Sequence, residues 1–140
     1  MPEVSLNGVC DMHVHTNPDL RLMAYNDFEL AEAAIRVGAR AIVIKSHHGF
    51  TANRAFLTNE YVRKIHGENT GFTMYGSVTM NKSIGGKDPS AGVDIVIGWK
   101  VVPELLEVFK MVKDYGAVLG TAHFRNGGLS ECRTRIKSEP

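Results

Sequence analysis

The feature that most constrains the fold is an unbroken apolar run, Ala41-Ile42-Val43-Ile44, that ends abruptly in Lys45-Ser46-His47-His48-Gly49. A short run without polar alternation is typical of a strand covered on both faces, as in a parallel sheet. Helical periodicity lies on both sides of it, from Asn26 to Gly38 and from Thr51 to Gly67. This alternation of strands and helices predicts an α/β fold with a parallel sheet and right-handed crossovers.

The ends of the two helices carry recognisable signals. Asn26 is a candidate N-cap with Glu29 in the capping-box position, and Gly38 supplies the stop. We expect Thr51 to cap the second helix and Gly67 to end it. The two helices are therefore expected to be separate elements with the apolar run between them.

The rest of the chain continues the pattern, so we expect about five strands in all. A helix should begin at Pro103 and close at Gly116. Further strands are expected at Val9–His15, Phe72–Met80, Val93–Ile97 and Ala117–Gly120. We predict one α/β domain over residues 1–128 and a polar tail over residues 129–140.

Composition narrows the class of protein. The 140 residues are 44% hydrophobic and 22% charged, which favours one globular domain. Sixteen basic and fifteen acidic side chains give a net charge of +1 with no basic run, so nucleic acid is not an expected partner. Cys10 and Cys132 form no CxxC motif, and no segment is long and apolar enough to span a bilayer. These features favour a cytoplasmic protein with no membrane partner. A small-molecule substrate is expected from the candidate hydrolytic site described next.

Histidines follow several of the expected strands. His13 and His15 are two residues apart, so both should project from one strand face, near enough to share a metal or bridge two. His47 and His123 follow two other strands, and the carboxyl ends of parallel strands lie together. We predict that these four histidines hold a divalent cation, with zinc favoured over manganese or iron. Each could instead be a polar rim or loop residue without a metal.

Other polar residues near these strand ends are candidates for catalysis or substrate binding. Asp11 either ligates the metal or orients a histidine. Lys45 binds an anionic substrate, bridges two metals when carboxylated, or is merely solvated or salt-bridged. His48 contacts substrate or solvent. Asn81 and Arg21 are the predicted substrate-binding residues, although turn chemistry and surface charge would also explain them. We interpret His66, at the expected end of a helix, as structural.

Three motifs give the chain a family resemblance. Asp11-Met12-His13-Val14-His15-Thr16 resembles the opening motif of the polymerase and histidinol phosphatase (PHP) family and of the wider amidohydrolase superfamily. Ile44-Lys45-Ser46-His47 and Thr121-Ala122-His123 are similar to later ligand strands of PHP proteins. An uncharacterised amidohydrolase-like group is similar over four segments distributed along most of the chain's length: Asp11–Asp19, Lys45–His48, Asn81–Pro89 and Val102–His123.

This resemblance implies a (β/α) barrel of the TIM type, a centre of one to three metal ions and hydrolysis of an ester, amide or phosphoester. The chain departs from the family by its length, since such barrels usually need about 200 residues or more. Strands between Gly86 and Val102 and after His123 are missing or shortened, so the barrel is expected to be incomplete. The late histidine and aspartate of these centres have no counterpart.

We therefore expect a metal-dependent hydrolase in which a metal-bound hydroxide attacks the substrate. The alternative is a degenerate metal-binding α/β module without turnover. A third hypothesis is a purely structural remnant of the fold that binds no metal. The open sheet would leave strand edges unpaired unless a partner chain or the C-terminal tail covers them, and a homo-oligomer is one expected remedy.

Overall fold

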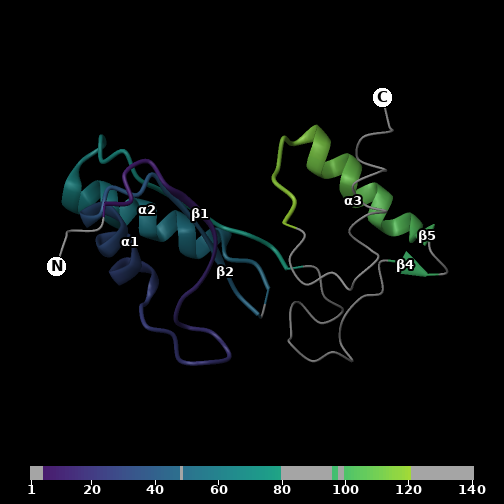
Figure 1. The fold of residues 1–140 in the computed structure, drawn as a ribbon, viewed down its shortest axis with the longest axis horizontal. Helices are drawn as coiled ribbons and strands as arrows, with labels where there is room; N and C mark the ends of the chain where they lie inside the picture. The colour runs from purple at the N-terminus through teal and green to yellow at the C-terminus, as the bar shows by residue number, and fades with distance from the viewer. Residues whose placement is uncertain (1–4, 48, 80–95, 98–99, 121–140) are drawn as a thin grey trace. The chain divides into compact units, whose positions relative to one another are not determined.

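The computed structural model describes residues 5–47, 49–79, 96–97 and 100–120. The chain divides into two compact units, Met1–Gly92 and Val93–Pro140, which are described separately (Figure 1). The first unit has a parallel three-stranded sheet with the strand order β1-β2-β3. Its elements are β1 (Cys10–His15), α1 (Asp27–Arg36), β2 (Ala41–Lys45), α2 (Ala52–His66) and β3 (Thr73–Tyr75). The predicted α/β class with parallel β/α units is confirmed for this unit.

The ends of α1 follow the sequence signals. The side chain of Asn26 accepts a hydrogen bond from the amide of Glu29, and the Glu29 carboxylate accepts one from the amide of Asn26, each at 2.9 Å. At the other end Gly38 has φ +76° and donates its amide to the carbonyl of Ile35 at 3.1 Å. The capping box and the glycine stop are both confirmed.

Helix α2 begins and ends where predicted, but its N-terminus is built differently. Thr51 occupies the N-cap position, yet its side chain makes no capping bond. The fully buried hydroxyl instead donates to the carbonyl of Ile44 at 2.8 Å and accepts from the amide of Ser77 at 2.8 Å. The predicted side-chain cap is wrong because this hydroxyl joins the end of β2 to the segment after β3.

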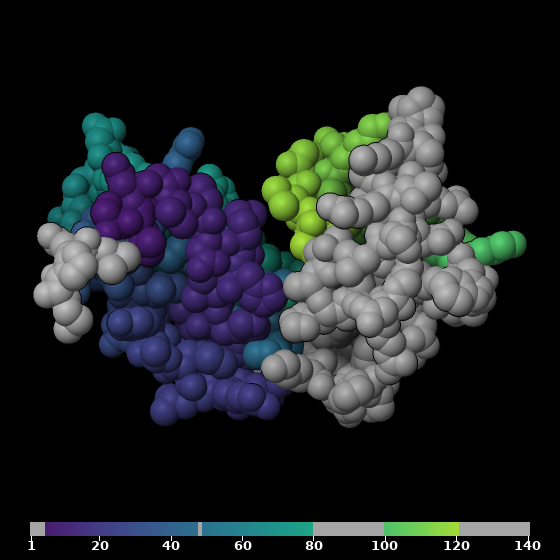
Figure 2. All heavy atoms as spheres, viewed as in Figure 1, coloured from purple at the N-terminus to yellow at the C-terminus, as the bar shows by residue number. Residues whose placement is uncertain are grey.

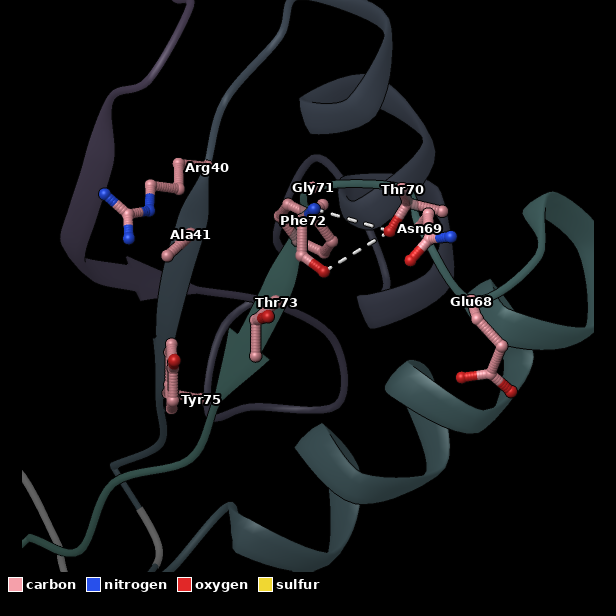
Figure 3. A pocket seen from close by; sticks show the side chains of 9 residues that line it. All are labelled: Arg40, Ala41, Glu68, Asn69, Thr70, Gly71, Phe72, Thr73 and Tyr75. Atoms are coloured by element: carbon pink, nitrogen blue, oxygen red, sulfur yellow. Dashed lines mark hydrogen bonds between the residues drawn. The ribbon is translucent and has the colours of Figure 1, made fainter.

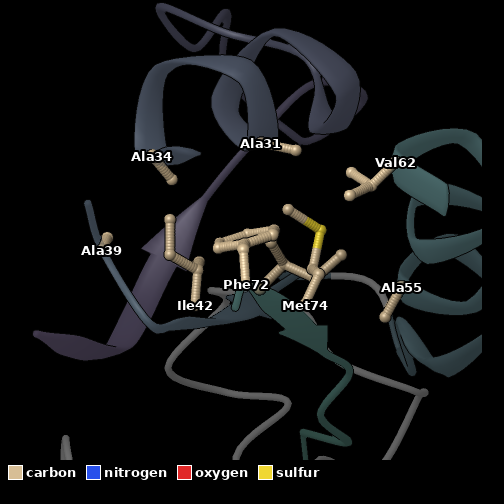
Figure 4. Close-up of a cluster of buried hydrophobic side chains, with 9 residues drawn as sticks. Ala31, Ala34, Ala39, Ile42, Ala55, Val62, Phe72 and Met74 are labelled. Atoms are coloured by element: carbon tan, nitrogen blue, oxygen red, sulfur yellow. The ribbon is translucent and has the colours of Figure 1, made fainter. Parts of the chain in front are cut away.

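The core lies between the sheet and the two helices. Alanines at the inner faces of α1 and α2 let the helices approach the strands closely, and Phe72 and Met74 fill the space between them (Figure 4). The buried cluster consists of Ala31, Ala34, Ala39, Ile42, Ile44, Ala55, Val62, Phe72 and Met74. Val43, whose neighbours on β2 belong to the cluster, is half-buried. Within the residues described, both helices pack against the face of β2 that carries Ile42 and Ile44, and the prediction that β2 is covered on both faces stays a prediction.

Strand β3 is shorter than predicted. Its outer edge meets a side chain of α2, because the amide group of Asn59 donates to the carbonyl of Met74 and accepts from its N–H, both at 2.8 Å. Beyond Tyr75 the backbone of Gly76 passes against the first residue of α2. The pairing with β2 therefore covers only three residues, and Met80 lies outside the described residues.

The second unit contains an antiparallel pair, β4 (Val96–Ile97) and β5 (Lys100–Val101), followed by α3 (Pro103–Asp114). The start of α3 at a proline confirms the prediction. The prediction that Val93–Ile97 adds a strand to a parallel sheet is wrong for Val96–Ile97, which pair antiparallel with Lys100–Val101. Antiparallel pairing needs only a short turn, whereas a parallel neighbour needs a crossover.

The strand expected at Ala117–Gly120 is not formed. The amide of Ala117 donates to the carbonyl of Val112 at 2.9 Å and that of Gly116 to Lys113 at 3.1 Å, which closes the C-terminus of α3. Val118 is exposed. An apolar run becomes a strand only beside a pairing partner, and no strand includes these residues. The single domain predicted to residue 128 stays a prediction, and residues 129–140 lie outside the described part.

Among the helices that the structure describes, none has the length and apolar character needed to cross a membrane.

A substitution at Gly76 tests the close approach of β3 to α2. A Cβ atom there would lie 2.4 Å from the Cα and 2.5 Å from the N of Ala52, so Gly76→Ala must displace backbone. We expect a loss of about 1–3 kcal/mol in the free energy of unfolding, measured by urea denaturation. Gly120→Ala is the control, since its Cβ would meet nothing within 4 Å. Equal stability of the two variants would contradict this packing.

Candidate metal centre

The carboxyl ends of β1 and β2 bring His15 and His47 together. His15 is the register partner of Lys45, and His47 follows two residues later. The two imidazole rings stack, with centroids 4.2 Å apart and planes inclined by 16°. Strand order thus places these two histidines as the sequence predicted, whereas their role as metal ligands stays a prediction.

A buried carboxylate joins the two rings. Asp19 Oδ2 lies 2.9 Å from His15 Nδ1, and Asp19 Oδ1 lies 2.8 Å from His47 Nδ1. The side chain of Asp19 is 0% exposed, and Oδ1 also accepts the amides of Leu20 at 2.7 Å and His47 at 3.2 Å. If each Nδ1 carries the hydrogen, each Nε2 has a free lone pair. The sequence analysis gave Asp19 no role in the site, although its position four residues after the second histidine was the available signal.

Asp19 is held in its anionic form. Burial, the largest influence on its pKa, raises that pKa, but hydrogen bonds from His15, from the Leu20 amide and from His47 together outweigh it. The pKa of Asp19 therefore lies well below its usual range. The centre consequently carries a buried negative charge at neutral pH, which attracts a cation to the imidazoles.

These three residues fit a divalent cation. One donor atom from each of His15, Asp19 and His47 can be chosen so that all lie within 4.8 Å of one another. Two imidazole nitrogens and a carboxylate oxygen are a donor set that zinc accepts, and three protein ligands leave a position open. Alternatively Asp19 keeps the Nδ1 hydrogens in place while the Nε2 atoms bind the metal. Both arrangements use the same side chains.

His13 lies beside this group on an exposed stretch of β1. Its ring centroid is 5.3 Å from that of His15, at 52°. The register with β2 shifts between Asp11 and Val14, where β1 holds one extra residue. The carboxylate of Asp11 accepts the backbone amide of His13 at 3.0 Å. Figure 2 shows this N-terminal part of the chain, in purple, at the molecular surface. The two histidines of the motif are therefore neighbours, as predicted, with His13 on the solvent side.

The other predicted site residues are spread over the chain. Lys45 is half-buried at the end of β2, and Arg21 is exposed in the loop between β1 and α1. His48, Asn81 and His123 lie outside the described residues, so their predicted roles stay predictions.

A second polar cluster, which the sequence analysis missed, contacts the loop between His15 and Asp19. The guanidinium of Arg54 pairs with both carboxylate oxygens of Asp27, at 2.7 Å and 2.8 Å. Its Nη2 is 2.8 Å from the hydroxyl of Thr16 and 2.9 Å from the carbonyl of Asn17, and its Nη1 is 3.2 Å from that of Pro18. Arg54 thus links α2, the first residue of α1 and the loop after β1.

A third histidine also pairs with a carboxylate, but at the surface. His66 Nε2, at the end of α2, lies 2.9 Å from Glu32 Oε1 on α1. Hydrogen bonds from His66, the largest influence, and from Tyr61 lower the pKa of Glu32. The side chains of His66 and Glu32 are each about one third exposed, and their link between two helices supports the structural interpretation of His66.

A hollow of about 540 Å³ lies at the opposite end of the strands (Figure 3). Arg40 and Ala41 border it at the start of β2, and Thr73 at the start of β3. The histidines follow the carboxyl ends of the strands, so this hollow is separate from the candidate centre.

The fold and the site define a class: an α/β protein with a candidate divalent-metal centre at the carboxyl ends of parallel strands. Residues 8–102 match a family described as "Family of unknown function (DUF6282)", and the chain belongs to this family. The matched stretch includes His15, Asp19, His47 and Arg54. No curated protein and no solved structure matches the chain.

Replacing the buried carboxylate tests its role in the metal-free protein. Asp19→Asn leaves one oxygen for four donors, so we expect a loss of about 1–3 kcal/mol in the free energy of unfolding at neutral pH. Because the folded pKa is lowered, this stabilisation is present above the unfolded pKa of about 3.9 and declines as the pH falls below it. Urea unfolding across this range measures the gap between wild type and variant.

The exposed Asp114 supplies the control, Asp114→Asn, which should change stability little at any pH. If the difference in unfolding free energy between wild type and Asp19→Asn grew as the pH fell, the lowered pKa of Asp19 in the folded protein would be contradicted.

Proposed function

We propose that this protein is a metal-dependent hydrolase acting on an ester, amide or phosphoester, with a divalent cation, zinc in first place, bound by His15 and His47 while Asp19 holds their Nδ1 hydrogens. One observation carries the proposal: imidazoles from the ends of two neighbouring parallel strands meet on one buried carboxylate. The resemblance of the Asp11–Thr16 motif to PHP and amidohydrolase proteins supplies the reaction class. His13 and His123 are proposed as further ligands.

The side chains of this centre have separable tasks. A bound divalent cation supplies Lewis-acid polarisation and a nucleophile at neutral pH. Asp19 orients the two rings through their Nδ1 atoms, and His13 lies on the exposed side from which a substrate approaches. Lys45, beside His15 in the sheet register, is suited to hold an anionic group of the substrate. Asp11 remains a proposed catalytic residue, together with His48.

The proposal extends to the architecture around the centre. A parallel sheet with helices on one face is the repeating unit of a (β/α) barrel, whose active sites lie at the carboxyl ends of the strands. In the described residues β1 is an edge strand, which supports pairing with a second copy of the chain. A cytoplasmic location belongs to the same proposal on the basis of cysteine content.

Metal content is the first test. Protein purified without chelator should carry near-stoichiometric divalent transition metal, measured by elemental analysis. His15→Ala and His47→Ala should each weaken metal binding by about tenfold or more, because each removes one of the few protein ligands.

His66→Ala is the matched control, since His66 also pairs with a carboxylate at 2.9 Å but at the surface. Metal that persists in both site variants, or that is lost equally in His66→Ala, would contradict the assignment. No metal after reconstitution with zinc, manganese or iron would exclude the hydrolase.

Turnover is the second test. Nitrophenyl acetate, nitrophenyl phosphate and an amino-acid anilide represent the three substrate classes. We expect hydrolysis of at least one, lost with chelator and restored by the metal, because the nucleophile depends on the cation. His47→Ala should abolish it and His66→Ala should not. A chain that binds metal at His15 and His47 but hydrolyses none would instead support the non-catalytic metal-binding module.

A further inference from the structure

Arg54 contacts the part of the loop that directly precedes Asp19. Its guanidinium reaches the carbonyls of Asn17 and Pro18 and the hydroxyl of Thr16. Three consecutive residues between His15 and Asp19 are therefore held by one side chain from α2. The position of the Asp19 carboxylate depends on the path of these residues, because it is the next residue along the chain.

The cluster is built to keep that path fixed. The side chain of Arg54 is 17% exposed and that of Asp27 is 11% exposed, and Thr16 is buried. Asp27 is the first residue of α1, and its carboxylate also accepts the Thr16 hydroxyl. A planar guanidinium that binds a carboxylate through two parallel hydrogen bonds has little freedom to rotate. The loop is consequently fixed to two helices that belong to the rigid core.

Asp19, at the end of this loop, needs a fixed position because its carboxylate contacts two imidazole rings. The carboxylate of Asp19 must reach His15 and His47 at once, and its contacts with them are 2.9 Å and 2.8 Å long. Partners that orient metal-binding histidines act through such distances. A change in the path of the loop would leave one ring without its partner.

We propose that Arg54, held by Asp27, is a positioning residue of the metal centre: it sets the loop so that Asp19 orients both imidazoles. This inference rests on the metal centre proposed above. Arg54 acts through Asp19, and its charge is matched by Asp27 rather than by a substrate.

The test compares Arg54→Lys with Arg63→Lys. Lysine keeps the charge but cannot bind Asp27 through two parallel hydrogen bonds while also reaching the loop carbonyls. Arg63 lies on the same helix in an exposed ion pair with Glu60, so its variant controls for the loss of a guanidinium from α2. Cobalt(II) titration with the visible absorption spectrum reports affinity and ligand geometry. We expect Arg54→Lys to weaken cobalt binding about 10- to 100-fold and to alter the spectrum.

A second measurement needs no metal. The amides of Leu20 and His47 both donate to Asp19 Oδ1, so their hydrogen exchange in the apoprotein reports where Asp19 lies. In Arg54→Lys these two amides should exchange faster, while core amides such as that of Ile44 keep their protection. A purely structural role would accelerate both groups together, which would overturn the proposal.

A milder variant, Asp27→Asn, keeps the proposal testable if Arg54→Lys fails to fold. It retains one carbonyl oxygen for Arg54, so we expect a smaller loss of cobalt affinity in the same direction. Wild-type affinity and spectrum in both variants would overturn the positioning role alone. Wild-type protein that binds no cobalt would overturn the metal centre itself, so the two failures are distinguishable.

Discussion

The buried carboxylate of Asp19 is the constraint on which the rest of the site depends. A carboxylate in a protein interior needs compensation for its lost hydration, and here four donors supply it: two imidazole nitrogens and two backbone amides. Three of the four come from His15 and His47, at the ends of two different strands. The stability of the loop and the geometry of the candidate centre are therefore consequences of the same hydrogen bonds.

Arg54 and Asp27 form an ion pair that holds the residues directly before that carboxylate. An ion pair that is largely removed from water is costly unless its remaining hydrogen-bonding capacity is satisfied. Here the loop carbonyls and the Thr16 hydroxyl satisfy it, so the pair and the loop stabilise each other. The helices that bury alanines against the sheet thereby also determine where the loop runs. Packing and chemistry are coupled through one guanidinium.

Local signals predicted local structure well. The capping box at Asn26, the apolar strand from Ala41 and the proline start of α3 depend only on nearby residues. The prediction of a strand at Ala117–Gly120 was wrong because strand formation needs a pairing partner, which the local sequence does not specify.

The site was predictable only in part. The HxH spacing and the strand-end position pointed to His15 and His47, because parallel strands bring their ends together. Asp19 and Arg54 were missed for a different reason. An aspartate beside a proline has an adequate local explanation as a turn former, and an arginine on a helix has one as a surface charge. Their roles arise from contacts between residues far apart in the sequence. Asp19 and His47 are separated by 28 residues, and Arg54 is separated from the loop residues that it contacts by 36 to 38. Only the tertiary path of the chain creates those contacts.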